Sequence, residues 1–297
     1  KALHPRYVGA MSLIVGHRLF RARLASLQAS PAPAYGFFGP EHIGKRGVAE
    51  AFAHSLVPQG EHVAHPDIVI FDARAQTTIE ELRAFLEQIH RTSAYGGRRA
   101  CLIDHADDLG TASLNALLKD IEEPRAGTVF LLIASRPEAL PATVRSRLVP
   151  LLFSTLSLAE MTDCATRRGL PASWAASALG RPGLLLRREA SPAWWERTEA
   201  MAERVLNVFE GGRVGSLVAA LDDWQKTLEK NAEAEAYWRI MLLLAMSRWC
   251  ARPRLVAGQA CVDAWRLLET AIPPRVGMAA AWLREHVPEG RAILPTI

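Results

Sequence analysis

The chain has 297 residues, of which 49% are hydrophobic and 22% are charged. This length and composition suit two or three globular domains and exclude a chain that is disordered throughout. The formal net charge of +4 at pH 7 is shared evenly between the two halves of the chain, so no basic tail or arm argues for nucleic-acid binding.

The four cysteines, Cys101, Cys164, Cys250 and Cys261, lie far apart and form no C-x-x-C pair. Their spacing excludes the usual zinc sites and favours reduced, mostly buried thiols. No run reaches the roughly 18 consecutive apolar residues of a membrane span. Residues 1–10 also lack the apolar segment of a signal peptide. We therefore expect a cytoplasmic protein whose first ten residues are a leader before a natural start at Met11, although the sequence leaves open whether they are native.

Four short apolar runs in the first half of the chain are uninterrupted and largely free of charge, which is typical of parallel strands covered on both faces. They are Tyr35–Phe38, Ile68–Phe71, Ala100–Ile103 and Val129–Ala134. Helical periodicity separates them, at Gly47–Leu56, Thr78–Thr92 and Ala112–Ile121. This alternation predicts an α/β domain with right-handed crossovers.

The pattern changes after residue 155, where the strand-like runs disappear and all eight tryptophans fall between Trp174 and Trp282. One apolar helical face carries Trp238, Met241, Leu242, Ala245 and Trp249. Such a stripe favours the core between packed helices over a cofactor site. The second half of the chain is therefore predicted to be helical, with its boundaries near the Gly- and Pro-containing segments 180–183 and 189–194.

A glycine-rich loop, "GPEHIGKR", follows the first predicted strand and opens a helix. Gly39, Gly44 and Lys45 match the phosphate-loop pattern Gly-x-x-x-x-Gly-Lys. In this context the backbone N–H groups would cradle phosphate oxygens and the lysine would reach the terminal phosphates. A glycine turn with an ordinary surface lysine is the alternative.

The positions that should hold magnesium and water are altered. Arg46 stands where the pattern requires a hydroxyl, and a guanidinium cannot coordinate a cation. Asp104 ends the third predicted strand and suits a second magnesium element, but His105 follows it where ring-forming ATPases of this type carry a glutamate. We therefore interpret the site as unable to hydrolyse nucleotide.

Four segments occur in order at familiar spacings: "IVGHRLFRARLASL", "GPEHIGKR", "LIDHADDLGTASLNALLKDIEEP" and "FLLIASRPEALPATVRSRL". Together they resemble the AAA+ clamp-loader subunits of bacterial DNA polymerase III, and the altered loop resembles the delta prime branch of that family. The resemblance implies an AAA+ P-loop α/β domain with a parallel sheet over residues 1–153. It further implies a small helical lid over 154–190 and an all-α collar domain for oligomerisation over 191–297.

The resemblance also assigns roles to single residues. Ser135 takes the position of the first sensor. Arg147, preceded by Ser146, takes that of an arginine finger that reaches the ATP of a neighbouring subunit. An ordinary loop arginine is the alternative for Arg147. Leu148 replaces the usual cysteine, which we interpret as a change in packing. Gly39, Gly44, Lys45, Asp104 and Ser135 would then be a vestigial nucleotide site.

Two departures from the family pattern concern metals and the second sensor. The usual zinc module after the phosphate-loop helix is missing, and His54, His62 and His65 match no standard ligand set, so no metal is expected. Arg181 precedes the Pro-Gly pair of the second-sensor region, so a nucleotide-contacting arginine is not assured there. The pair Glu122–Glu123 is interpreted as a solvated or subunit-facing edge.

The function that follows is a subunit without its own ATPase activity, which needs no cofactor. It would act as a structural stator in a pentameric ring with the gamma/tau and delta subunits, and the ring would load the sliding clamp onto primed DNA. Passive binding of ATP or ADP, direct DNA contacts, stoichiometry and self-association are left open. The alternatives are an active AAA+ ATPase of the gamma/tau or DNA-remodelling type and a P-loop phosphotransferase.

Overall fold

The structure is a computed structural model that describes residues 24, 26–57, 65–76, 78–90, 93–94 and 96–210. The chain divides into two compact units, Lys1–Leu186 and Arg187–Ile297. The predicted leader, the tryptophan and methionine stripe and most of the predicted collar lie outside the described residues. The division into domains at residues 153 and 190 stays a prediction.

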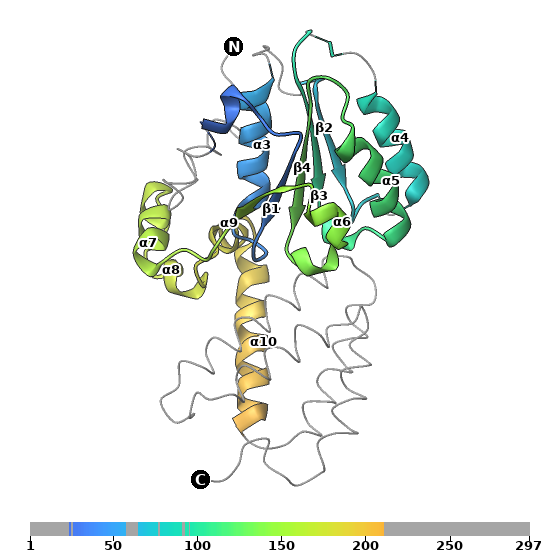
Figure 1. Cartoon of the computed structure of the whole chain (residues 1–297). Helices are drawn as coiled ribbons and strands as arrows, with labels where there is room; N and C mark the ends of the chain where they lie inside the picture. The colour runs from blue at the N-terminus through green and yellow to red at the C-terminus, as the bar shows by residue number, and fades with distance from the viewer. Residues whose placement is uncertain are drawn as a thin grey trace, which may run out of the picture. The chain divides into compact units, whose positions relative to one another are not determined.

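The first unit contains a five-stranded parallel sheet with the order β2-β3-β4-β1-β5 (Figure 1). Its strands are β1 (Ala34–Phe38), β2 (Ile68–Asp72), β3 (Arg99–Asp104), β4 (Thr128–Ala134) and β5 (Val149–Leu152). The four predicted strands are confirmed, each within two residues at either end. The fifth strand was missed because it is short, lies at an edge and contains Pro150, which seldom occurs in central strands.

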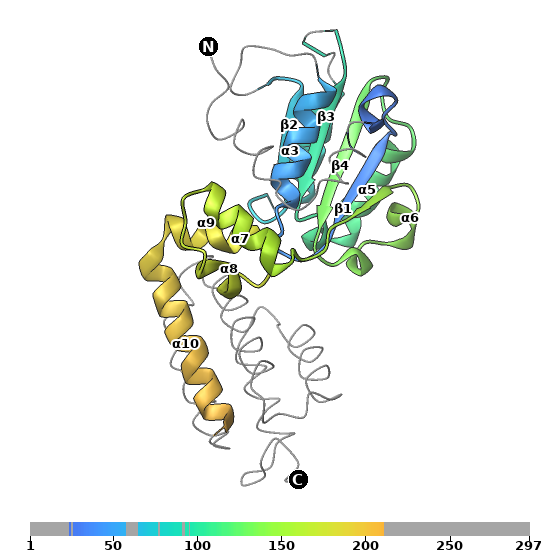
Figure 2. The same cartoon turned by 90° about the vertical axis from the view of Figure 1, so that its left-hand side faces the viewer.

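Helices cover both faces of the sheet (Figures 1 and 2). Apolar side chains of α3 (Lys45–Leu56) pack with one face of the sheet, and those of α4 (Ile79–Ile89) and α5 (Thr111–Glu122) pack with the other. The two cores share the strands, whose successive side chains point to opposite faces. In β3, for example, Cys101 belongs to the α4 and α5 side and Leu102 to the α3 side. This confirms the predicted α/β class.

The remaining described elements are short or lie near the end of the described region. They are η1 (Ala106–Asp108), η2 (Pro137–Ala139), α6 (Ala142–Arg145), α7 (Leu158–Arg167), α8 (Trp174–Ser177), α9 (Pro182–Ala190) and α10 (Pro192–Glu210). Helix α4 begins at the predicted cap, because the Thr78 hydroxyl accepts a hydrogen bond from the backbone N–H of Glu81 and the Glu81 carboxylate accepts one from that of Thr78. Among the helices that the structure describes, none has the length and apolar character needed to cross a membrane.

Candidate functional site

The loop between β1 and α3 requires its two glycines. Gly39 has a φ of 151°, and a Cβ added there would lie 2.3 Å from the carbonyl oxygen of Phe153. Gly44 has a φ of 98° and directly precedes α3, but a Cβ there would meet nothing within 4 Å. Both φ values lie in the region that L side chains rarely adopt. Gly39 is therefore needed for a close approach of two backbones, and Gly44 for the turn alone.

Lys45 is turned back onto its own loop. Its Nζ atom donates to the carbonyl oxygens of Gly39 at 2.6 Å and Pro40 at 2.7 Å, and to the Ser135 hydroxyl at 3.0 Å. The residue is 6% exposed. Burial lowers the pKa of Lys45 to about 8, although Glu41, Asp107 and Asp104 act in the opposite direction. The structure thus brings together Lys45 and Ser135, two of the residues assigned to the vestigial nucleotide site.

Arg46 lies on the acidic residues at the carboxyl ends of two strands. The parallel register of β2 and β3 places Asp72 opposite Asp104. The Arg46 Nη1 atom lies 3.0 Å from the Asp104 Oδ2 atom and 3.6 Å from the Asp72 Oδ2 atom. Its Nε atom donates to Glu50, one turn along α3, at 2.9 Å. Burial alone would lower the pKa of Arg46, but the hydrogen bond to Glu50 and the charge of Asp104 outweigh it and raise the pKa.

His105 completes a group that could in principle ligate a cation. Ligand atoms of Asp72, Asp104 and His105 all lie within 4.8 Å of one another. The Asp104 carboxylate is already committed, because its Oδ1 atom accepts the His105 N–H at 3.0 Å and its Oδ2 atom accepts Arg46. The guanidinium of Arg46 would repel a divalent ion placed there. The residues around Asp104 therefore do not fit magnesium while Arg46 keeps this position.

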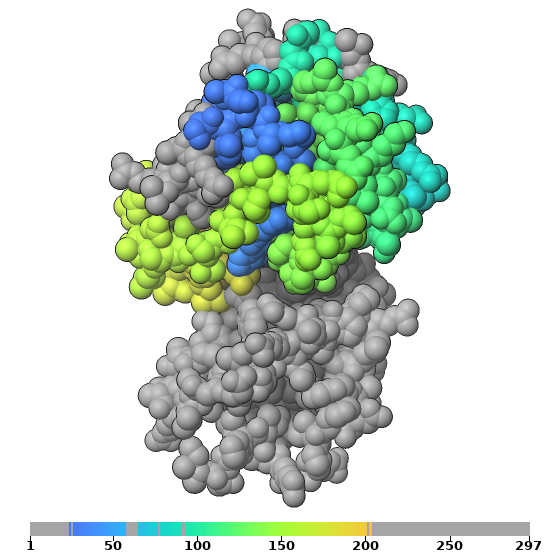
Figure 3. Space-filling view, viewed as in Figure 1, coloured from blue at the N-terminus to red at the C-terminus, as the bar shows by residue number. Residues whose placement is uncertain are grey.

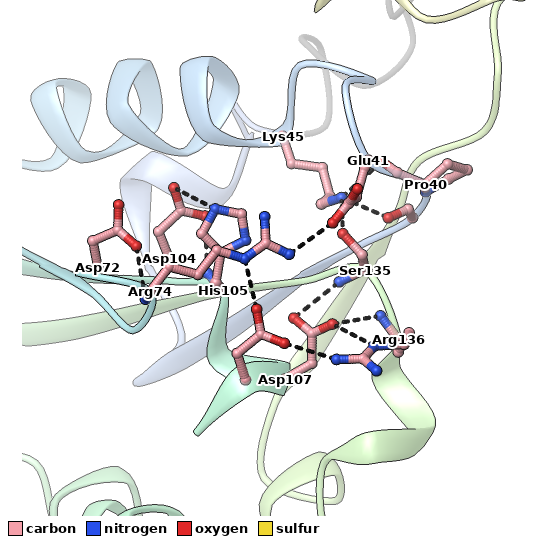
Figure 4. Close-up of polar contacts among 12 residues, drawn as sticks. Pro40, Glu41, Lys45, Asp72, Arg74, Asp104, His105, Asp107, Ser135 and Arg136 are labelled. Carbon is pink, nitrogen blue, oxygen red and sulfur yellow. Dashed lines mark hydrogen bonds and ion pairs between the residues drawn. The ribbon is translucent and has the colours of Figure 1, made fainter. Parts of the chain in front are cut away.

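A closed ring of polar contacts surrounds the site (Figure 4). Arg74, just past β2, donates to Glu41 in the phosphate loop at 2.8 Å and to Asp108 at 2.7 Å. The ring continues from Asp108 to Arg136, from Arg136 to Asp107, from Asp107 to the Ser135 N–H, and through the Ser135 hydroxyl to Lys45. It closes through the backbone, because the Lys45 Nζ atom also donates to the carbonyl oxygen of Pro40, the residue before Glu41. Sequence reasoning missed the Arg74–Glu41 pair, because isolated charged residues in loops carry no periodic signal. Only their position just after a strand end could have drawn attention to them.

The second-sensor region lies against the phosphate loop within the first unit. An Nη1 atom of Arg181 donates to the carbonyl oxygen of Glu41 at 3.3 Å, and the Gly183 N–H donates to that of His42 at 2.8 Å. A Cβ at Gly183 would lie 2.8 Å from the same His42 oxygen. The sequence left a role for Arg181 at the nucleotide site unassured, and the structure places its guanidinium on the loop backbone.

Arg147 and Ser146 lie apart from this ring, just after α6. Arg147 contacts Glu122 at 2.6 Å and donates to the Thr143 carbonyl oxygen at 2.8 Å, while the Ser146 hydroxyl donates to the same carbonyl at 3.1 Å. The side chains of Arg147 and Glu122 are 39% and 43% exposed. The segment around α6 contributes part of the light-green surface in view in Figure 3. Leu148, by contrast, is buried among core residues of the α4 and α5 side.

Comparison with known sequences identifies relatives of the α/β domain. The family model described as DNA polymerase III, delta subunit, matches residues 19–157. The delta prime subunit of Pseudomonas aeruginosa is 34% identical over 141 residues, which are 41% of this chain and 43% of that protein. The tau subunit of Salmonella typhimurium is 31% identical over 147 residues, 43% of this chain and 22% of that protein. The chain therefore matches less than half of the length of these curated relatives.

Solved structures support the same fold. A variant of RuvB from Thermotoga maritima aligns with a TM-score of 0.52 over 87% of this chain and 96% of that chain, at 15% identity. A second RuvB variant aligns with a TM-score of 0.51 over 86% of this chain and 93% of that chain. Likeness at this level of identity concerns the fold alone. In sequence, the α/β domain is thus similar to subunits of bacterial DNA polymerase III named delta prime and tau, and its fold is that of the RuvB variants.

Proposed function

We propose that this chain is a non-hydrolysing, delta prime-like subunit of the DNA polymerase III clamp loader. The observation that carries the proposal is the contact of Arg46 with Asp104 at 3.0 Å. Phosphoryl transfer in P-loop proteins uses a magnesium ion held by the loop hydroxyl and by the aspartate at the end of the neighbouring strand. Here the hydroxyl is replaced by Arg46, and the aspartate is bound by that same residue.

The group that would orient the attacking water is also changed. His105 has a φ of 54°, and its backbone N–H is bonded to the Asp104 carboxylate. Its Nε2 atom lies 3.9 Å from the Asp104 Oδ2 atom. The imidazole thus lies beside Asp72 and Asp104. It does not supply the negative charge that a glutamate would have at this position. The metal position and the water-orienting position are altered together, which supports loss of hydrolysis over a partial defect.

The contribution of this subunit to hydrolysis would be made in trans by Arg147. Two features support this role: the side chain of Arg147 is 39% exposed, and its polar contacts are with Thr143, Ser146 and Glu122 rather than with the phosphate loop. An arginine presented in this way can stabilise the charge that develops on phosphate oxygens in a neighbouring active site. Ser146 would help to orient it, since its hydroxyl lies 3.4 Å from the Arg147 Nη1 atom.

The partners follow from the family. Relatives of the α/β domain carry the names delta prime and tau of DNA polymerase III, so we propose a hetero-oligomeric ring that contains gamma/tau and delta subunits. Within a pentameric ring this chain would be the stator, and the complex would bring the sliding clamp and primed DNA together. Clamp and DNA would be reached through the complex, without a cofactor bound by this chain.

A steady-state ATPase assay on the purified chain tests the loss of hydrolysis. We expect turnover at background, equal in the wild type and in Lys45→Ala, with and without magnesium. The rival is an active gamma/tau-like ATPase, which retention of Lys45 and Asp104 favours. Turnover well above background that disappears in Lys45→Ala would establish the rival and overturn the proposal.

A further inference from the structure

We infer that Arg74 and Glu41 form an internal latch that closes the phosphate loop of this chain in place of a nucleotide. The two side chains come from segments 33 residues apart and meet at 2.8 Å. The latch deepens the proposed function, on which it rests in part, since it concerns nucleotide binding at a site proposed not to hydrolyse.

Because of the strand order, the contact between Arg74 and Glu41 joins two loops that follow non-adjacent strands, and in this sense it is a bridge. In the order β2-β3-β4-β1-β5, two strands separate β2, which Arg74 follows, from β1, which the Glu41 loop follows. At about 4.8 Å between neighbouring strands, the two strand ends are roughly 14 Å apart. The contact between Arg74 and Glu41 therefore links the loops that follow two non-adjacent strands, with β3 and β4 between them. Figure 4 shows the Arg74 side chain at this edge of the sheet.

The bridge is held at both of its ends. The Arg74 guanidinium contacts Glu41 and also the Asp108 carboxylate in η1, while its backbone N–H donates to Asp72 at 3.0 Å. The Glu41 side chain is 18% exposed and that of Asp108 is 23% exposed, against 40% for Arg74. Charged contacts in so sheltered a position are screened less by salt than ion pairs on an open surface.

The latch places a negative charge where a phosphate would otherwise supply one. Of the charged residues that act on the Lys45 ammonium, Glu41 acts most strongly. The hydrogen-bonding capacity of that ammonium is already used by two loop carbonyls and the Ser135 hydroxyl. An incoming phosphate would be repelled by the Glu41 carboxylate and would have to displace these contacts. The loop is thus saturated by the residues of its own chain.

Calorimetric titration of the full chain with ADP, in EDTA and again with magnesium, tests the latch. Glu41→Gln removes the negative charge, keeps the shape and takes away one of the two carboxylates that neutralise Arg74, whose positive charge can then attract phosphate. We expect its Kd for ADP to be lower than that of the wild type by about tenfold or more, equally in both buffers because Arg46 occupies the metal position. Arg74→Gln should gain less, because it removes a cation as well as the latch.

Asp163→Asn is the matched control. It breaks an exposed Asp–Arg pair on α7, with Arg167 at 2.9 Å, outside the polar ring, and should leave the ADP affinity unchanged. Thermal melting of each variant establishes whether it is folded. If Glu41→Gln does not fold, the test is made with Arg74→Gln. Equal affinity in the wild type and both latch variants, including binding too weak to measure in all of them, contradicts the latch. The ATPase assay above decides separately on the proposed function.

Discussion

Two regions of this domain use arginine in opposite ways. At the phosphate loop, Arg46 and Arg74 each contact two or more carboxylates, and these contacts belong to a network at the carboxyl edge of the sheet. Beyond α6, Arg147 makes one ion pair, with the half-exposed Glu122. The first region pairs its charges within a network of the same chain, whereas the second holds a partly exposed arginine with one carboxylate partner.

Under the proposed function, this contrast is that of a site that loses its chemistry while its fold is kept. The charges that would have held metal and phosphate are replaced by charges of the chain itself, so the loop, the sheet edge and Lys45 remain in place. The proposed function instead assigns the chemical role to Arg147, which lies outside this network. The predictions below test each side of this contrast.

The largest effect is expected from Arg147→Ala in a reconstituted clamp loader in which the other ATP sites are inactivated by substitution of their phosphate-loop lysines. Hydrolysis at the adjoining site should fall about 10³-fold or more, because developing phosphate charge loses its partner. Single-turnover hydrolysis measures this loss. The control is Arg145→Ala, two residues away and likewise exposed, whose side chain donates to the Pro137 carbonyl. Hydrolysis that is unchanged by Arg147→Ala would remove the arginine-finger role.

Gly39→Ala should disrupt the phosphate-loop region most. The added Cβ would lie 2.3 Å from the Phe153 carbonyl oxygen at a φ of 151°, so the backbone has to move. We expect a loss of about 3 kcal/mol or more in the free energy of unfolding, measured by denaturant titration. Gly44→Ala is the control, with a φ of 98° but open space, and should lose about 1–2 kcal/mol. Equal losses would mean that the close approach to Phe153 is unimportant.

Lys45 should make the stability of the fold depend on pH. Its pKa is lowered by burial from 10.5 to about 8, so the unfolded chain binds more protons than the folded chain between these values. Stability therefore rises with pH across this window, by an amount of the order of 3 kcal/mol. The comparison is with Lys45→Met, which lacks the titrating group. A stability difference between the two proteins that stays flat from pH 8 to 10.5 would contradict burial of the ammonium.

The smallest effect is expected on the free energy of unfolding when the Arg147–Glu122 pair is removed. Glu122→Gln removes the partner of Arg147, and an exposed ion pair contributes about 0–1 kcal/mol. The free energy of unfolding should change by no more than this, and the difference should vanish at high salt. A loss of several kcal/mol would show that Arg147 is fixed within its own subunit, against the role proposed for it.

The fold was predictable where burial leaves a pattern. The central strands β3 and β4 are apolar almost throughout because helices cover both of their faces, and that continuity is visible in the sequence. Helix α3 was predicted to begin at Gly47 but begins at Lys45, since glycines at positions 44 and 47 obscure its first turn. Edge strand β5 leaves a weaker trace, with Pro150 among its four residues.

The candidate site was predictable in its residue types but not in its contacts. The motif at Lys45 and the substitution of Arg46 indicate that the metal machinery is lost, yet they do not say that Arg46 binds Asp104. Nor do they reveal that Lys45 turns back onto loop carbonyls. Such contacts depend on which strand ends are neighbours and on side-chain rotamers, neither of which is encoded in local spacing. The Arg74–Glu41 pair required the three-dimensional strand order.

The burial of Leu148 has a consequence for the entropy of assembly. Because this side chain is packed in the core, the backbone that carries Arg147 is already ordered before any partner arrives. If Arg147 acts in trans as proposed, only the rotatable bonds of one side chain would have to be fixed at the neighbouring subunit, roughly 1.5–2 kcal/mol for an arginine, instead of the larger loss of ordering a whole loop. The buried Leu148 thus reduces the conformational entropy that would be lost when a subunit interface forms at Arg147.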